Sequence, residues 1–248
     1  MPGRAGPVVA IASGKGGVGK TWFSITLAHA LARRGRRVLL FDADLGLANV
    51  DVQLGLAPPL DIGHVVSGQS TLADAVLHHT PGAFDVLAGR SGSGALSAMG
   101  GVDLERVLAG LRHLSSRYDT VLLDLGAGLD RATRRMASWA DTLLVVATEE
   151  PTSLTDAYAT LKLTYGDRDG SADARLVVNQ VTSAQSGQRT FATLERACSA
   201  FLRQNPLLAG MVRRDAHVPD SIRRQALLLT HYPGSPAGQD VEKLARTL

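Results

Sequence analysis

The phosphate-loop motif at residues 14–21 constrains this chain more than any other feature. These eight residues, GKGGVGKT, fit the template G-x-x-x-x-G-K-[ST] at every fixed position. The glycines let backbone N–H groups turn toward a phosphate chain, because a Cβ would block the approach. By this motif, Lys20 reaches the β- and γ-phosphates and the Thr21 hydroxyl binds Mg²⁺. The alternative, a glycine-rich turn without a ligand, is weakened by the complete match.

The segments on either side of the loop have the expected character. Residues 8–12 are a short apolar run that predicts a buried strand. Residues 21–34 predict a helix, with apolar positions at Phe23, Leu27 and Leu31. A strand, a glycine loop and a helix in this order place a helix N-terminus where it can hold an anion.

The same alternation continues along the chain and predicts the fold class. Further apolar runs indicate strands at 37–41, 84–87, 120–123, 142–147, 175–179 and 208–212, and helical patterns lie at 70–79, 102–117, 131–139, 152–164, 188–204 and 219–227. Nearly continuous Val, Leu and Ile is typical of strands buried on both faces of a parallel sheet. We expect a doubly wound, mostly parallel α/β sheet of seven or eight strands, with helices on both faces. The glycine-rich segment 89–94 is interpreted as a strand-to-helix loop, since it lacks the lysine of a second anion site.

Composition narrows the class of protein further. With 248 residues, 45% of them hydrophobic, and no long linker, we expect one domain over residues 1–248. The one cysteine, Cys198, excludes an internal disulfide, fits a reducing cytosol and is expected in the core. No run approaches the roughly 18 apolar residues of a membrane span. The formal charge of +3 neither requires nor excludes nucleic acid or anionic lipid as a partner.

Acidic residues follow two of the predicted strands. Asp42 and Asp44 come after the run 37–41, and Asp124 ends the run that begins at 120. Carboxylates at the carboxyl ends of buried strands face the crevice where α/β ligands bind. Asp124 is placed to hold Mg²⁺ directly or through water, and Gly126 lets the backbone approach the γ-phosphate. A strand-ending Asp is often only a turn former, but these lie opposite a phosphate loop.

The form K-G-G-x-G-K-T resembles the deviant Walker A motif of the ParA/MinD family of P-loop ATPases. The resemblance implies an ATP-sandwiched homodimer in which Lys15 crosses to the partner's phosphates; a solvated loop lysine is the alternative. Asp-x-Asp followed by Gly-Leu-Ala-Asn resembles the switch region of MinD-type ATPases. There the resemblance implies that Asp42 supports the Mg²⁺ shell, that Asp44 orients the attacking water, and that Asn49 contacts phosphate or the partner subunit.

The base pocket is predicted from two further stretches of the resemblance. Asn179 matches the family's strand-end Asn that reads the adenine edge, and an amide has the donor and acceptor that adenine requires. Pro219 and Asp220 match a later loop that closes over the base. The complete predicted site comprises three sets: catalytic Lys15, Lys20 and Asp44; nucleotide-binding Gly14, Lys15, Gly16, Gly17, Val18, Gly19, Lys20, Thr21, Trp22, Asn49, Gly126, Asn179, Pro219 and Asp220; and metal-binding Thr21, Asp42 and Asp124.

Residues 84–94 and 220–237 resemble the FlhG branch of the family, the MinD-like regulators of flagellar number. This implies a slow ATP hydrolase in the cytoplasm whose ATP dimer is an on state, dependent on dimerisation and on partners. The implied partners are an FlhF-type GTPase and flagellar switch or regulator proteins. A ParA-type DNA-binding partition ATPase and a MinD-type division-site regulator are the alternatives. The DNA-binding ATPase would use a basic face built from Arg134, Arg135, Arg213, Arg214, Arg223 and Arg224. We favour the interpretation that these arginines are only solvated surface residues.

Two departures from the FlhG pattern lie at the chain ends. Seven residues precede the first predicted strand, so the N-terminal helix that stimulates the GTPase is in doubt. In residues 239–248, Val241, Leu244, Ala245 and Leu248 share one face of a short helix. Such a helix is marginal alone and has little apolar area for the inner face of the plasma membrane. We keep open both a membrane-binding helix and a helix packed on the domain.

Overall fold

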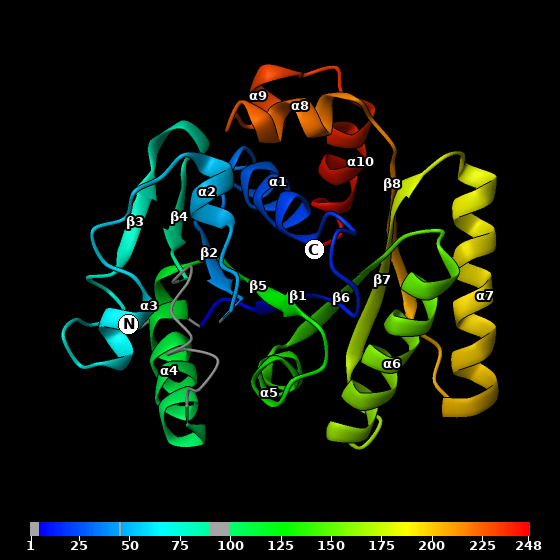
Figure 1. The fold of residues 1–248 in the computed structure, drawn as a ribbon, viewed down its shortest axis with the longest axis horizontal. Coiled ribbons are helices and arrows are strands. Elements are labelled where there is room, and N and C mark those ends of the chain that lie inside the picture. The colour runs from blue at the N-terminus through cyan, green and yellow to red at the C-terminus, as the bar shows by residue number, and fades with distance from the viewer. Residues whose placement is uncertain (1–4, 45, 90–99) are drawn as a thin grey trace.

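The structure, a computed structural model, describes residues 5–44, 46–89 and 100–248, whose strands form one eight-stranded sheet (Figure 1). The strand order is β3-β4-β2-β5-β1-β6-β7-β8, and every neighbouring pair except β3–β4 is parallel. The strands are β1 Val8–Ser13, β2 Val38–Ala43, β3 Val76–His79, β4 Phe84–Leu87, β5 Thr120–Ala127, β6 Thr142–Ala147, β7 Asp173–Val181 and β8 Leu207–Arg213. The expected mostly parallel, doubly wound sheet is confirmed.

Helices cover both faces of this sheet (Figure 1). On one face lie α1 Lys20–Ala32, α2 Val50–Leu54, α8 His217–Arg223, α9 Leu228–His231 and α10 Pro236–Leu244. On the other lie α4 Gly101–Leu114, α5 Arg131–Trp139, α6 Pro151–Asp167 and α7 Ala184–Leu202. The short α3 Ile62–Val66 contributes Ile62 to the core on this second face. Each face therefore has its own hydrophobic core.

The central strand β1 shows why the apolar runs of the sequence are continuous. Val8 and Ala10 point into the core under α4 to α7, whereas Val9 and Ile11 point into the core under α1 and α10. All six residues of β1 are buried. Since successive side chains of a strand point to opposite faces, a strand with both faces covered needs apolar residues at every position.

One predicted helix is wrong. The helix expected over 70–79 is replaced in its second half by β3, which runs antiparallel to β4. His79 lies opposite Phe84 in this pairing and packs on its ring at 5.0 Å between centroids. A four-residue edge strand is too short to show a period of two, so tertiary pairing overrides the local pattern. The helix expected over 219–227 ends early: α8 begins before it and stops at Arg223, residues 224–227 are not helical, and α9 starts at Leu228. Residues 90–94 of the predicted glycine loop lie outside the described residues.

The C-terminal helix α10 is packed on the domain. Val241, Leu244 and Ala245 are at most 3% exposed and belong to the core around α1. The apolar face predicted in 239–248 is therefore used inside the protein. Cys198 is fully buried in the opposite core, as expected, and burial raises the pKa of its thiol to about 11. Among the described residues, no helix is long and apolar enough to cross a membrane.

A buried histidine should make the fold sensitive to acid. His29 of α1 is 4% exposed, and burial, with the nearby charge of Arg33, lowers its pKa from 6.5 to about 4. The unfolded chain therefore binds more protons between pH 6.5 and 4, so stability falls as the pH drops through this window. We expect His29→Gln to reduce the loss of stability between pH 7 and 5 by about 1 kcal/mol, allowing for partial solvent screening.

Urea unfolding of both proteins at pH 7 and pH 5 measures this difference. The exposed His113→Gln is the matched control and should unfold like the wild type at both pH values. An unchanged pH dependence in His29→Gln would contradict the assignment.

Candidate nucleotide-binding site

Strand register brings the predicted site together at the carboxyl edge of the sheet. β5 lies between β1 and β2, so the phosphate loop that follows β1 adjoins both acidic segments. Asp124 pairs in register with Ile11 on one side and with Asp42 on the other. The edge where these parallel strands end is the usual ligand crevice of an open α/β sheet.

Asp124 is the centre of the buried polar contacts beneath the phosphate loop. Its Oδ1 accepts hydrogen bonds from Lys20 Nζ at 2.8 Å and from Ser24 Oγ at 2.8 Å. Its Oδ2 accepts a hydrogen bond from Thr21 Oγ1 at 2.7 Å. The Lys20 and Asp124 side chains are only 7% and 1% exposed. Ser24 was not predicted from the sequence, although its position four residues after Lys20 places it on the same face of α1.

Asp42 is a second buried carboxylate beside Asp124. Burial, followed by the negative charge of Asp124, raises the Asp42 pKa from 3.8 to about 7. Backbone N–H groups of Asn49 and Val50, each at 2.8 Å from Oδ2, partly oppose that rise. The same two hydrogen bonds fix the segment between β2 and α2 over the end of the sheet.

Asp44 lies at the mouth of the site, next to Gly126. Its Oδ1 accepts hydrogen bonds from the backbone N–H groups of Gly46 and Leu47, whereas Oδ2 has no hydrogen bond within the described part of the chain. A Cβ on Gly126 would stand 3.3 Å from Asp44 Oδ1, so the glycine allows this close approach. Asn49, in contrast, is exposed and donates its side-chain amide to the Leu47 carbonyl.

Lys15 is held at the rim of the loop by residues of its own chain. Its Nζ lies 2.6 Å from Glu150 Oε2 and 3.0 Å from Thr152 Oγ1, at the start of α6. The Lys15 and Glu150 side chains are 38% and 65% exposed, so solvent screens this pair. Glu150 was not predicted as part of the site, because nothing in the sequence near residue 150 pairs it with residue 15.

A hollow of about 490 Å³ adjoins the phosphate loop where the base was expected. Two residues of the predicted nucleotide-binding set, Pro219 and Trp22, line it, and the buried Nε1 of Trp22 has no hydrogen-bond partner in the described structure. Asn179 reaches the loop itself: its Nδ2 donates to the Val18 carbonyl at 2.7 Å. Asp220 faces elsewhere, since it pairs with Arg223, Arg224 and Tyr232.

The carboxylate of Asp215 helps to hold the segment after β8 that lines this hollow. Asp215 accepts hydrogen bonds from the backbone N–H of His217 at 2.9 Å and from that of Ala237 at 3.3 Å. It also accepts a hydrogen bond from the Ser235 hydroxyl. Ser235 is the N-cap of α10, so one side of the hollow is tied to the start of the C-terminal helix.

The oxygen donors beneath the loop suit Mg²⁺. Thr21 Oγ1 touches Asp124 Oδ2, and Asp42 lies opposite in register, which gives the hydroxyl and carboxylate ligands that Mg²⁺ prefers. Burial, and after it the negative charge of Asp124, raises the pKa of Asp42, and a divalent cation nearby would favour the ionised form of both carboxylates. No group of three or more His, Cys, Asp or Glu among the described residues could hold an ion. Phosphate oxygens and water would therefore complete the coordination.

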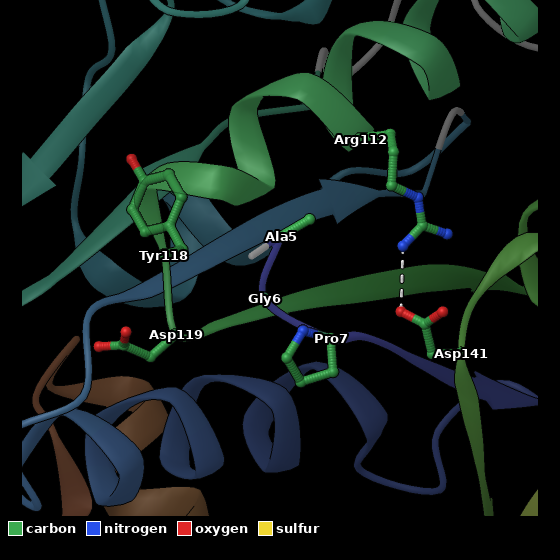
Figure 2. A pocket seen from close by; sticks show the side chains of 7 residues that line it. All are labelled: Ala5, Gly6, Pro7, Arg112, Tyr118, Asp119 and Asp141. Carbon is green, nitrogen blue, oxygen red and sulfur yellow. Dashed lines mark hydrogen bonds and ion pairs between the residues drawn. The ribbon is translucent and has the colours of Figure 1, made fainter. Parts of the chain in front are cut away.

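A second hollow lies at the opposite edge of the sheet (Figure 2). It is formed where β1, β5 and β6 begin, by Ala5, Gly6, Pro7, Arg112, Tyr118, Asp119 and Asp141. Its charged groups are already paired: Arg112 with Asp141, and Asp119 with Arg37, which lowers the Asp119 pKa to about 2. The charged groups that line this hollow are thus all engaged with other residues of the described chain.

Comparison with known proteins agrees with this geometry. The family described as the CobQ/CobB/MinD/ParA nucleotide binding domain matches residues 9–228. The chain belongs to this family. It is 35% identical to the antiactivator FleN of Pseudomonas aeruginosa over 96% of this chain and 85% of that protein. It is 29% identical to the flagellum site-determining protein YlxH of Helicobacter pylori, over 97% and 81% of the two chains.

The solved structures place the fold in the same group. The septum site-determining protein MinD from Pyrococcus horikoshii, in complex with Mg-ADP, superposes with a TM-score of 0.80 at 23% identity, covering 97% of this chain and 95% of that one. The predicted resemblance to ParA/MinD P-loop ATPases is confirmed. The individual roles predicted for the site residues stay predictions.

The close contact between the phosphate loop and Asn179 makes one loop glycine critical for this MinD/ParA-type domain. Gly19 has φ 86°, and a Cβ there would stand 2.7 Å from Asn179 Nδ2. We expect Gly19→Ala to destabilise the fold by about 1–3 kcal/mol through strain at this backbone conformation. Thermal unfolding measures this effect.

Gly16→Ala is the matched control. A Cβ at Gly16 meets nothing within 4 Å, and this glycine does not have a positive φ. Its melting temperature should stay close to that of the wild type. Equal melting temperatures for the two variants would contradict the tight packing of the loop on Asn179.

Proposed function

We propose that this chain is an FlhG-type cytoplasmic switch that dimerises on ATP, hydrolyses it slowly and thereby controls the number or placement of flagella. The observation that carries the proposal is the group under the phosphate loop, in which Lys20, Thr21 and Asp124 are joined while Asp44 stands beside Gly126. The flagellar role is supported by the similarity to FleN and YlxH over nearly the whole chain. We take residues 1–248 to act as one ATPase domain.

In this proposal each residue has one task. The loop N–H groups and Lys20 hold the β- and γ-phosphates, and Thr21, Asp42 and Asp124 hold Mg²⁺. The Mg-ADP complex of the Pyrococcus horikoshii relative supports this choice of cofactors. Bound Mg²⁺ supplies charge neutralisation on the phosphates. Asp44 accepts a hydrogen bond from the attacking water on its free Oδ2 and keeps it in line.

Lys15 has the task of completing the site of a second copy. Phosphoryl transfer depends on positioning and on cations near the transferred group, so a lysine delivered across a dimer acts like an arginine finger. The weak, solvent-screened contact of Lys15 with Glu150 supports this role, because little holds the lysine in its own chain. The exposed Leu47 and Leu129 flank the acidic segments and offer apolar area to the second copy.

The alternative, a DNA-binding partition ATPase, receives less support. The arginines predicted for its basic face are mostly paired with carboxylates. Arg134 pairs with Asp167, Arg135 with Glu105, Arg213 with Asp240, and both Arg223 and Arg224 with Asp220. Of that set, Arg214 alone has no ion pair among the described residues. Since electrostatic DNA binding needs several free cations aligned on phosphates, we favour the flagellar switch.

The dimer is tested by its mass. With Mg-ATP we expect light scattering to give twice the monomer mass, and with Mg-ADP the monomer mass. Asp44→Ala should bind ATP but keep the dimer, because hydrolysis that would release it is lost. Asp74→Ala, an exposed aspartate away from the phosphate loop in the chain, is the control and should behave like the wild type. A monomer mass with both Mg-ATP and Mg-ADP would contradict the proposal of an ATP-dependent dimer.

The role of Lys15 is tested by turnover. We expect Lys15→Ala to bind ADP normally but to hydrolyse ATP at below about one-hundredth of the wild-type rate, as for loss of a finger residue. Glu150→Gln removes the carboxylate that holds Lys15 and should leave turnover equal or higher. Exposed Lys162→Ala controls for the loss of a charge. Normal turnover in Lys15→Ala would exclude a crossing lysine.

A further inference from the structure

The Asp124 carboxylate accepts hydrogen bonds from three side chains of α1, and two of these have a task in the proposed function. Lys20 holds the phosphates, and Thr21 holds Mg²⁺. The third donor, Ser24, lies outside the loop motif, and its Oγ is 2.8 Å from Asp124 Oδ1. Neither the motif nor the family resemblance assigns a task to this serine, although it touches the carboxylate at the centre of the site.

The proton of the Ser24 hydroxyl is committed to Asp124. Ser24 is fully buried, and its Oγ also lies 3.0 Å from the Lys20 carbonyl oxygen, one turn earlier in α1. A hydroxyl has one proton to donate, and an ionised carboxylate can only accept. The Lys20 carbonyl, in contrast, can accept a backbone N–H from the next turn of the helix. The proton therefore points to Asp124, where the hydrogen bond is charge-assisted and stronger.

The other two donors change partners when a nucleotide binds as proposed. Lys20 Nζ, which is 2.8 Å from the same Oδ1, turns to the phosphates. Thr21 Oγ1, which is 2.7 Å from Oδ2, binds Mg²⁺. Ser24 has no such alternative, because its side chain is fully buried and out of reach of a ligand. Its hydrogen bond is therefore the one that can hold Oδ1 throughout, and it leaves Oδ2 beside the threonine that binds the metal.

We propose that Ser24 is a positioning residue whose hydroxyl holds Asp124 Oδ1, so that Oδ2 is presented to the Mg²⁺ of a bound nucleotide. The proposal rests on the nucleotide and Mg²⁺ binding of the proposed function and adds a residue, outside the loop motif, that sets the metal affinity. Side chains that orient a metal ligand without touching the metal matter for binding. Their loss typically lowers metal affinity or activity by about 10- to 100-fold.

A second buried hydroxyl of α1 provides a comparison within the same helix. Thr26 is 3% exposed, and its Oγ1 donates to the Trp22 carbonyl at 2.8 Å, one turn earlier. In the described part of the chain, Thr26 makes no hydrogen bond to a carboxylate. A loss of its hydroxyl therefore removes a contact within the helix and leaves Asp124 untouched.

Calorimetry of ADP binding, in EDTA and over a series of Mg²⁺ concentrations, tests the assignment without hydrolysis. In EDTA we expect Ser24→Ala to bind ADP like the wild type, because Lys20 and the loop are intact. The Mg²⁺ concentration that gives half of the metal-dependent gain in ADP affinity should rise at least about tenfold. Ser24→Cys keeps the shape but has only a weak donor, so it should behave like Ser24→Ala, whereas Ser24→Thr keeps the hydroxyl and should restore Mg²⁺ binding.

Thr26→Ala is the matched control and should show the Mg²⁺ dependence of the wild type. Unchanged Mg²⁺ dependence in Ser24→Ala or Ser24→Cys would overturn the assignment, and the second of these variants decides if the first fails to fold. Equal weakening of ADP binding with and without Mg²⁺ would also overturn it, since a merely structural role predicts that result. These outcomes leave the proposed function standing, whereas a wild type that binds no ADP would overturn the proposed function as well.

Discussion

The structure depends on the buried carboxylate of Asp124. It lies at the end of the strand between β1 and β2, where bulk water does not reach it, and three donors from the first turns of α1 satisfy it. A buried charge of this kind is tolerated only when it is paired and hydrogen-bonded. The contact therefore fixes where α1 begins relative to β5. The phosphate loop, which joins β1 to α1, is confined to the space that remains.

The charges around Asp124 are only partly balanced. Lys20 supplies one positive charge beside two buried carboxylates, and burial together with the charge of Asp124 raises the pKa of Asp42. The same lysine is the residue that should turn to the phosphates when a nucleotide binds. Ligand binding would thus exchange one set of charge pairs for another rather than create pairs in a neutral pocket.

Much of this could be predicted from the sequence, for physical reasons. The continuous apolar runs indicated the parallel strands because both faces of the sheet are covered by helices. The loop motif indicated that the phosphate site follows the first strand, β1. Asp42 and Asp124 could be placed next to each other because the ends of parallel strands share one edge of the sheet. The strand β3 was missed because four residues show no reliable period, and its pairing with β4 is decided only in the folded chain.

The contacts that involve distant residues could not be predicted. Glu150 lies 135 residues from Lys15, and the engagement of Asn179 with Val18 spans 161 residues. Such distances are set by the topology of the whole sheet, and a single sequence holds no signal for them. The position of Asp220 illustrates the same limit: its place after Pro219 suggested the base pocket, but neighbouring arginines and Tyr232 hold it elsewhere.

The link through Asp215 has a consequence for work on the C-terminal end. Ser235 and Ala237, at the start of α10, help to hold the segment that forms one side of the base hollow. Deleting α10 would remove those contacts together with the apolar residues that α10 buries against α1 and β8. A truncated protein is therefore expected to bind nucleotide more weakly. Weaker binding to a membrane or to a partner protein would then follow from the reduced nucleotide affinity and not from the loss of an anchor. Interpreting such a deletion as the removal of an anchor would require nucleotide affinity to be measured on the same truncated protein.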